Sequence, residues 1–234
     1  MRKTLIFLLV LAIVCTLVSV ALFKKESVHA SVEITERQVI IIDAGHGGFD
    51  GGAVAEDGTS EKDINLNIAL TLGELLKTGG YDVVYTRTTD DGTEDNTDAT
   101  ISQRKKSDLN NRLELTEKYP DAVFISIHLN KFTTSSANGA QVFYSSQFES
   151  ARELSLLIQK SIVSVLQPDN IRVVKKGSDS TFLLKKAVIP SVIVECGFLS
   201  NSNELTLLKN EEYQKQMAFA IFCGINDYFI LKGC

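Results

Sequence analysis

The sequence has too few cysteines for a disulfide-stapled protein: only four occur in 234 residues. Cys15 lies in an apolar run near the N-terminus, which leaves Cys196, Cys223 and Cys234 as an odd number. No framework of paired disulfides is therefore implied. With 44% hydrophobic residues, the chain has enough apolar material to bury one sizeable core instead.

Basic residues are also scarce outside the N-terminal segment. Residues 1–30 hold four basic residues and one acidic residue, so the remainder carries 20 basic against 28 acidic side chains, a net charge of −8. This excess of negative charge argues against nucleic acid as a partner. Internal repeats and signs of a second domain are absent as well, so residues 31–234 are expected to form one domain.

The N-terminal segment resembles a targeting or anchoring element. Arg2 and Lys3 precede an uncharged run of 20 residues, 4–23. At about 1.5 Å per residue, a helix of this length crosses a hydrocarbon core of about 30 Å. A signal peptide cut after Ala30 and an uncleaved membrane anchor both remain open, and the length of the run favours the anchor. In both cases the domain is expected outside the cytoplasm, secreted or membrane-anchored.

Strands alternate with helices along the domain, which predicts an α/β fold. We expect a mostly parallel, or mixed, sheet of about six strands with helices on both faces. Ser60 is expected to cap the first helix with Asp63 as reciprocal partner. The acidic stretch 88–100 is expected to be a solvated loop or flexible flap. The expected strands are 39–43, 81–86, 123–127, 139–144, 171–174 and 191–194, with 182–184 also extended, and the expected helices are 61–78, 107–119, 148–165, 201–209 and 211–231.

Polar residues stand where three of the expected strands end. His46 follows the first strand, His128 continues the third and Glu195 follows the last, while Glu61 lies in the first turn of a helix. In open α/β sheets, ligands bind outside the carboxyl ends of the strands. Two imidazoles and a carboxylate with an open coordination position make a catalytic zinc set, and a second carboxylate outside that set can act as the base.

Each of these residues also has a simpler interpretation. A lone histidine is more often a hydrogen-bonded structural residue than a ligand. Glu61 alone is explained by the favourable effect of a carboxylate near a helix N-terminus. Glu195 is harder to explain in this way, because a carboxylate directly after a buried strand is expensive to bury unless it is used or paired.

Three other kinds of site share parts of this pattern. The glycine-rich loop 45–52 could bind phosphate, but Asp50 stands where a dinucleotide pattern has its third glycine. A two-histidine, one-carboxylate set also suits non-haem iron, although nothing suggests a co-substrate site. Cys196 could be a nucleophile, but strand alternation points it away from the face of Glu195, which favours a buried structural thiol.

Five segments, taken in order, carry a family likeness: Asp-Ala-Gly-His-Gly-Gly (43–48), Ser-Glu-Lys (60–62), Thr-Arg-Thr-Thr-Asp (86–90), Phe-Ile-Ser-Ile-His-Leu-Asn (124–130) and Val-Glu-Cys-Gly-Phe-Leu-Ser-Asn (194–201). Together they resemble the zinc-dependent N-acetylmuramoyl-L-alanine amidases of bacterial cell walls, amidase type 3. The likeness runs from about Val39 to Tyr228. A short domain without wall-binding repeats is most similar to the spore-cortex, germination-specific members. Ala44 and Cys196 depart from the family pattern without touching a presumed ligand.

The resemblance implies a role for each residue of the site. His46, Glu61 and His128 would hold one Zn²⁺, and Glu195 would be the catalytic carboxylate. Asn130 would orient the substrate or a ligand, with a turn-stabilising role as the alternative. The implied reaction is hydrolysis of the amide between N-acetylmuramic acid and L-alanine in peptidoglycan, in spore cortex maturation with muramic-lactam formation.

Two other functions share the same residues. One is a zinc peptidase that cuts within the stem peptide, and the other is a non-catalytic wall-binding protein. The partners expected are peptidoglycan and, through residues 4–23, a membrane; an accessory protein cannot be read from the sequence. The forespore intermembrane space or cortex is the expected location within the narrower, spore-specific interpretation.

Overall fold

The computed structural model describes residues 37–178 and 181–233. The expectations about residues 1–30, including cleavage and membrane attachment, lie outside the described residues. Among the helices that are described, none combines the length and the apolar character needed to cross a membrane.

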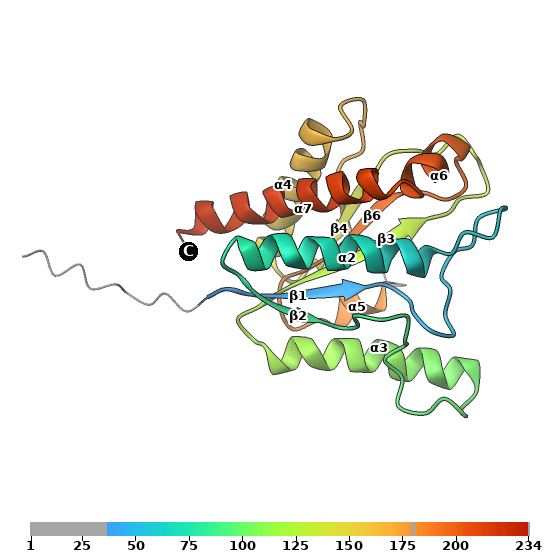
Figure 1. Ribbon diagram of the computed structural model, residues 1–234. Coiled ribbons are helices and arrows are strands. Elements are labelled where there is room, and N and C mark those ends of the chain that lie inside the picture. The colour runs from blue at the N-terminus through green and yellow to red at the C-terminus, as the bar shows by residue number, and fades with distance from the viewer. Residues whose placement is uncertain (1–36, 179–180, 234) are drawn as a thin grey trace, which may run out of the picture. The chain divides into compact units, whose positions relative to one another are not determined.

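Six strands form one sheet in the order β2-β1-β3-β6-β4-β5 (Figure 1). The first four of these strands pair in parallel, whereas β4 runs antiparallel to β6 and parallel to β5. The predicted α/β fold with a mixed, mostly parallel sheet is confirmed. The strands are β1 (Val39–Ala44), β2 (Asp82–Tyr85), β3 (Val123–Asn130), β4 (Gln141–Tyr144), β5 (Lys175–Lys176) and β6 (Ser191–Phe198).

Helices cover both faces of the sheet, as predicted. Consecutive isoleucines of β1 serve both layers, because strand side chains alternate: Ile40 and Ile42 pack in the larger core with α2, α4 and α7, and Ile41 packs in the smaller one. The smaller core is covered by α3 and α5 (Figure 1). The helices are α2 (Glu61–Thr78), α3 (Ile101–Lys118), α4 (Glu149–Val165), α5 (Phe182–Lys186), α6 (Ser202–Leu208) and α7 (Glu211–Lys232).

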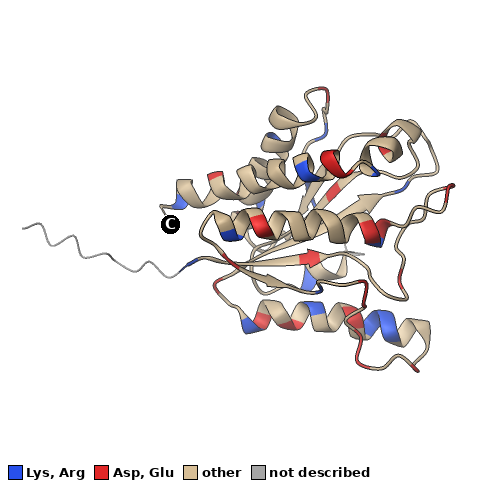
Figure 2. Cartoon of the chain, viewed as in Figure 1, with Lys and Arg blue, Asp and Glu red and all other residues tan. Residues whose placement is uncertain are grey.

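The layer beneath α3 contains a buried ion pair. Figure 2 shows α3 marked by charges of both signs along its length. Its Arg112, 2% exposed, forms an ion pair with the fully buried Asp43 of β1. Burial alone would raise the pKa of Asp43, but the Arg112 guanidinium and a hydrogen bond from Ser126 hold that pKa below its usual range. Opposite charges can be buried in a core when ion pairing and hydrogen bonds offset the cost of removing them from water.

Helix starts depend on caps that hydrophobic periodicity does not reveal. The predicted start of α3 at residue 107 is wrong, because Thr100 and Gln103 form a reciprocal capping box that begins the helix at Ile101. Ser60 occupies the N-cap position of α2 as predicted, but the reciprocal capping with Asp63 is not formed. The Ser60 hydroxyl donates to the carbonyl of Gly51 at 2.8 Å and makes no capping hydrogen bond.

Two short apolar segments differ from their predicted conformations. The strand predicted at 171–174 is absent, and only Lys175–Lys176 pair with β4. The side chain of Ile171 is 93% exposed, so its β-branched shape is not matched by a partner surface. Residues 182–184 belong to the helix α5, whose Leu183 and Leu184 are both buried. Short apolar runs do not distinguish a buried strand from a helical turn.

The acidic loop 88–100 has no helix or strand, as predicted, but it is not detached from the domain. Asp108 of α3 accepts a hydrogen bond from the backbone of Thr93 at 2.8 Å, and Asn111 donates to the Thr93 carbonyl. Arg104 forms an ion pair with Glu94 at 2.5 Å. These contacts fasten the loop to α3 and argue against a free flap.

Candidate metal centre

His46 lies in the loop that leaves β1, with its backbone in the left-handed region at φ 61°. Two arginines hold this stretch of backbone. Arg112 donates to the carbonyl of His46 at 2.7 Å, and Arg87 donates to the carbonyl of Gly45 at 3.1 Å. The imidazole is thereby directed toward the start of α2, where Glu61 lies.

The glycines of this loop make room for the polar side chains. A Cβ atom at Gly45 would overlap the His128 ring. At Gly52, where φ is +67°, it would lie 2.6 Å from both Glu61 Oε2 and His46 Cδ2. Gly45 and Gly52 are therefore explained by the crowding of three ligand-type side chains.

The sequence placed His128 and Glu195 at strand ends, and the structure corrects this. β3 continues past His128 to Asn130, and β6 continues past Glu195 to Phe198. His128 and Glu195 are direct neighbours across the two parallel strands, and the register shifts between His128 and Asn130. The two residues are therefore paired in register, and the irregularity follows them toward the carboxyl ends of the strands.

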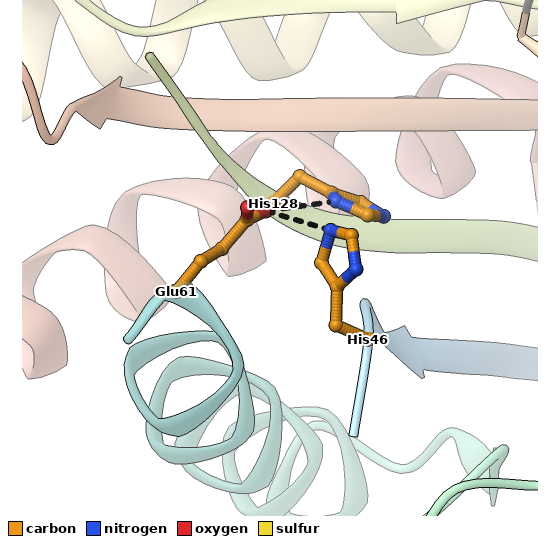
Figure 3. A group of neighbouring side chains, drawn as sticks. All are labelled: His46, Glu61 and His128. Atoms are coloured by element: carbon orange, nitrogen blue, oxygen red, sulfur yellow. Dashed lines mark hydrogen bonds and ion pairs between the residues drawn. The ribbon is translucent and has the colours of Figure 1, made fainter. Parts of the chain in front are cut away.

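Glu61 is the point where the group converges (Figure 3). It is the first residue of α2, and its side chain is 3% exposed. Its Oε1 lies 3.0 Å from His128 Nδ1 and 3.3 Å from His46 Nε2. The backbone N–H of Leu129 donates to Oε1 at 2.9 Å, and that of Ala53 donates to Oε2 at 2.8 Å. These backbone contacts fix the carboxylate in place.

The three side chains fit a zinc ion. Their ligand atoms lie within 4.8 Å of one another, and they form the one such group among residues 37–178 and 181–233. Burial opposes ionisation of Glu61, but hydrogen bonds from His128 and His46 hold its pKa well below the usual range. Burial lowers the pKa of His46, yet its carboxylate neighbours raise it to about 9. Negative charge thus attracts cations here, and two imidazole nitrogens with one carboxylate oxygen are zinc ligands.

Glu195 lies beside this group without joining it. Its Oε2 is buried and makes no hydrogen bond with any residue in the part of the chain that the structure describes. Burial, and then the nearby charge of Glu61, raise the pKa of Glu195 to about 7, although both histidines act in the opposite direction. A buried carboxyl group with an unpaired oxygen and a pKa near neutrality is suited to exchange a proton.

The carboxyl group of Glu195 should make the metal-free protein less stable above neutral pH. The pKa of Glu195 rises from 4.5 to about 7 on folding, so the unfolded chain ionises first and stability falls as pH rises from about 4.5 to 7. Glu195→Gln removes this penalty and should stabilise the metal-free protein by on the order of 2 kcal/mol at pH 8. Urea unfolding in excess chelator measures the difference in the free energy of unfolding between the variant and the wild type, which should vanish at pH 4. Equal stability of the two proteins at both pH 4 and pH 8 would contradict the raised pKa of Glu195.

Two contributors to the site were not found from the sequence. Asp50 Oδ2 lies 3.0 Å from His46 Nδ1, and Asp50 Oδ1 lies 3.0 Å from the Nζ atom of Lys105 on α3. A histidine followed four residues later by an aspartate in a glycine-rich loop was an available signal for the first contact. Lys105 has no such signal, because it is one of several basic residues on its helix and lies 55 positions from Asp50.

The two remaining candidates have different outcomes. Cys196 is fully buried in the core with α2, α4 and α7, and burial raises the pKa of its thiol, which confirms a structural thiol over a nucleophile. Asn130 lies at the end of β3, where its carbonyl accepts a hydrogen bond from Leu199 at 2.8 Å. A substrate-orienting role for Asn130 stays a prediction.

Comparison with known proteins identifies the relatives of this chain. Residues 40–227 match the family described as N-acetylmuramoyl-L-alanine amidase. The germination-specific N-acetylmuramoyl-L-alanine amidase of Bacillus subtilis is 34% identical over 196 residues, which cover 84% of this chain and 81% of that protein.

Solved structures show the same likeness. The CwlD amidase from Clostridioides difficile, determined in complex with the GerS lipoprotein, is 44% identical with a TM-score of 0.80, covering 83% of this chain and all of that one. An N-acetylmuramoyl-L-alanine amidase from Clostridium difficile 630 is 31% identical with a TM-score of 0.72, covering 84% of this chain and 99% of that one.

Proposed function

The chain belongs to the N-acetylmuramoyl-L-alanine amidase family and is an amidase of peptidoglycan, and from that premise we propose how its site performs the reaction. The observation that carries the proposal is the convergence of His46, Glu61 and His128 beside the unpaired carboxyl group of Glu195. Family membership favours this amidase over the peptidase and the non-catalytic wall-binding protein considered from the sequence.

His46, Glu61 and His128 would hold one zinc ion in this proposal. When bound, zinc supplies Lewis acidity, which polarises the amide carbonyl and makes water more acidic. The protein's part is to aim both imidazoles at one point. Because the pKa of His46 is raised to about 9, the ion would bind in exchange for the proton on that ring. Glu61 contributes the negative charge that a dication requires, and its two backbone hydrogen bonds restrain its movement.

Glu195 moves the proton. Its side chain takes the proton from the attacking water and returns it to the nitrogen of L-alanine as the amide bond breaks. This task requires a carboxylate near the metal ligands but outside them. The register position of Glu195 opposite His128, and its oxygen without a hydrogen-bond partner, support the role.

Asp50 should determine how tightly the metal is held. Its carboxylate contacts His46 Nδ1 at 3.0 Å, which leaves Nε2 facing Glu61. Carboxylates in this position orient metal-ligating histidines and strengthen their donor nitrogen. Asp50→Asn is expected to weaken zinc affinity by about 10- to 100-fold, measured by competition with a chromophoric chelator.

Asp57→Asn is the matched control for that measurement. Asp57 is a carboxylate of the same loop and forms an ion pair with Lys209 at 2.7 Å, without contacting any proposed ligand. It should keep wild-type zinc affinity. An Asp50→Asn protein that binds zinc as tightly as the control would remove Asp50 from the metal centre.

Product analysis tests the proposed chemistry directly. The full chain is incubated with purified wall material, with and without a chelator, and the products are examined by mass spectrometry. Intact stem peptides separated from the sugar chains are expected, and the chelator should prevent their release. Fragments cut within the stem peptide would indicate a peptidase, and unchanged products in excess chelator would exclude a required metal.

The narrower assignment is to the spore cortex. It is supported by the likeness to the Bacillus subtilis protein described as germination-specific. Deleting the gene in a spore-forming host should leave cortex muramic residues fully substituted with peptide and without muramic lactam. A chemically unchanged cortex would contradict the spore assignment and leave the amidase activity intact.

An accessory protein and a membrane attachment complete the proposal. The structure of the relative from Clostridioides difficile was determined in complex with a lipoprotein, which supports a search for a lipoprotein that copurifies with this chain.

A wall amidase acts outside the cytoplasm. Attachment through residues 4–23 predicts that the full chain sediments with membranes, whereas recovery in the soluble fraction after washing would favour cleavage.

A further inference from the structure

A cavity of about 520 Å³ lies beyond the ends of β3 and β6, against α6. We call it the α6 cavity. Its size falls within the range of sites for small ligands. It is bounded by three parts of the chain that are distant in sequence. Its walls include Glu56, Lys131, Phe132, Leu199, Ser200 and Leu205.

The α6 cavity is linked to the metal centre through the chain. Lys131 lies three residues past His128, which at about 3.3 Å per residue places it no more than about 10 Å further along the chain. The Nζ atom of Lys131 donates to the carbonyl of Val54 at 2.6 Å. The next residue back, Ala53, donates its N–H to Glu61. One wall of the cavity is therefore connected to a proposed metal ligand by short contacts.

The walls offer charges of both signs and an exposed ring. Lys131 and Glu56 are exposed, and neither forms an ion pair with another residue of the described ranges. The Phe132 side chain is 50% exposed and packs edge-on against Phe198, with ring centroids 5.1 Å apart. Charges and apolar area are thus available to a ligand.

A second cavity, of about 160 Å³, lies on the α3 side of the histidines. Its walls include both imidazoles, Leu109 and Leu183. Its charged side chains already pair with one another, Lys105 with Asp50 and Arg112 with Asp43 and Asp108. Because it touches the imidazoles directly, it suits the reacting amide and its immediate substituents. The α6 cavity, one step further from the metal centre, suits a group that extends away from the amide.

The substrate of an amidase of this family has two arms, a sugar chain and a peptide. The muramic carboxyl group is consumed in the amide, so the sugar arm is uncharged near the cleavage point. The peptide arm carries carboxylate groups. Extended peptide advances about 3.6 Å per residue, so the residues that follow L-alanine lie about 4–10 Å from the amide. The charged walls and this reach both favour the peptide arm.

We propose that the α6 cavity binds the acidic stem peptide beyond L-alanine, with the Lys131 ammonium pairing with a peptide carboxylate. This inference rests on the proposed function, because it places the reacting amide at the histidines. Only one of the three Lys131 donors is used by Val54. The remaining donors are free to bind the carboxylate, and Phe132 covers the apolar part of the peptide.

Two soluble substrates that differ by a single charge test this assignment. They are N-acetylmuramoyl-L-alanyl-glutamate and N-acetylmuramoyl-L-alanyl-glutamine, each with an amidated peptide end. The kcat and KM of the full chain are measured for both, and each compound is also tested as a competitor of wall digestion. The wild type should prefer glutamate about fivefold, through KM, as expected for a partly exposed ion pair.

Three variants separate the charge of Lys131 from its packing. Lys131→Gln should remove the preference for glutamate, whereas Lys131→Arg should keep it. Lys209→Gln is the matched control, because Lys209 lies outside the cavity and pairs with Asp57. It should behave as the wild type. Thermal unfolding confirms that all three variants are folded.

The outcomes distinguish this inference from the proposed function. Equal handling of both compounds by a wild type that digests wall overturns the inference alone. A Lys131→Gln protein that keeps the preference for glutamate also overturns it. If the KM of Lys131→Gln changes only with the length of the sugar chain, the cavity belongs to the sugar arm and the inference is likewise overturned. A wild type that releases no stem peptides from wall overturns the proposed function instead.

Discussion

Glu195→Gln should lower kcat by about 10²- to 10⁴-fold, the contribution of a positioned acid–base group. Glutamine keeps the size of the side chain but cannot accept the proton of the attacking water. Zinc content should stay near one ion per chain, because Glu195 lies outside the proposed ligand group of His46, Glu61 and His128. Product release from wall material and metal analysis of the same preparation provide the two measurements.

Glu204→Gln provides the matched control for this loss. Glu204 is also a buried carboxylate whose pKa is raised by burial, but its oxygens accept hydrogen bonds from the backbone of Gly139 and Phe198. The control should lose stability and keep kcat. An active Glu195→Gln protein, or one that has lost its metal, would contradict the proton-transfer role assigned to Glu195.

Removal of the Glu61 carboxylate should abolish metal binding and the stability that accompanies it. A ligand that binds only the folded protein at 100 times its dissociation constant contributes about 2.7 kcal/mol. For a domain of this size, that corresponds to an increase of about 5–10 °C in Tm. The wild type should show this increase on addition of zinc, and Glu61→Ala should show none and lack activity.

The Glu61→Ala protein should also be less stable than the wild type without metal. The N–H groups of Leu129 and Ala53 lose their acceptor, and each unsatisfied buried donor costs about 1–3 kcal/mol. Glu74→Ala is the control, because Glu74 is an exposed carboxylate of the same helix that pairs with Lys77. A zinc-dependent increase in Tm that persists in Glu61→Ala would exclude Glu61 as a ligand.

Local patterns were sufficient to predict the main elements. The runs 40–42 and 192–194 are buried, and they form β1 and β6 as expected. Burial on both faces selects consecutive β-branched residues, so the signal lies within the run itself. Helix α5 and the strand expected at 171–174 were predicted incorrectly, because their conformation depends on which surfaces they meet.

The set of candidate ligands could also be predicted, because it follows from a rule that holds for parallel α/β sheets in general. Parallel strands bring their carboxyl ends to one edge of a sheet, so His46, His128 and Glu195 were expected to meet. Glu61 could be chosen only together with the others, since a carboxylate early in a helix has a sufficient explanation of its own. The structure brings Glu61 within 3.0 Å of His128 and leaves Glu195 next to the group.

The sequence alone thus determined the fold class, the order of most elements and the four polar residues around which the site is built. Tertiary structure decided how these residues differ: Glu61 is held by backbone donors, and Glu195 keeps an oxygen without a partner. It also decided that Lys105 reaches Asp50 and that a cavity opens beside Lys131. Periodicity reports the burial of each element, whereas these contacts depend on the register of distant strands and the path of the loops between them.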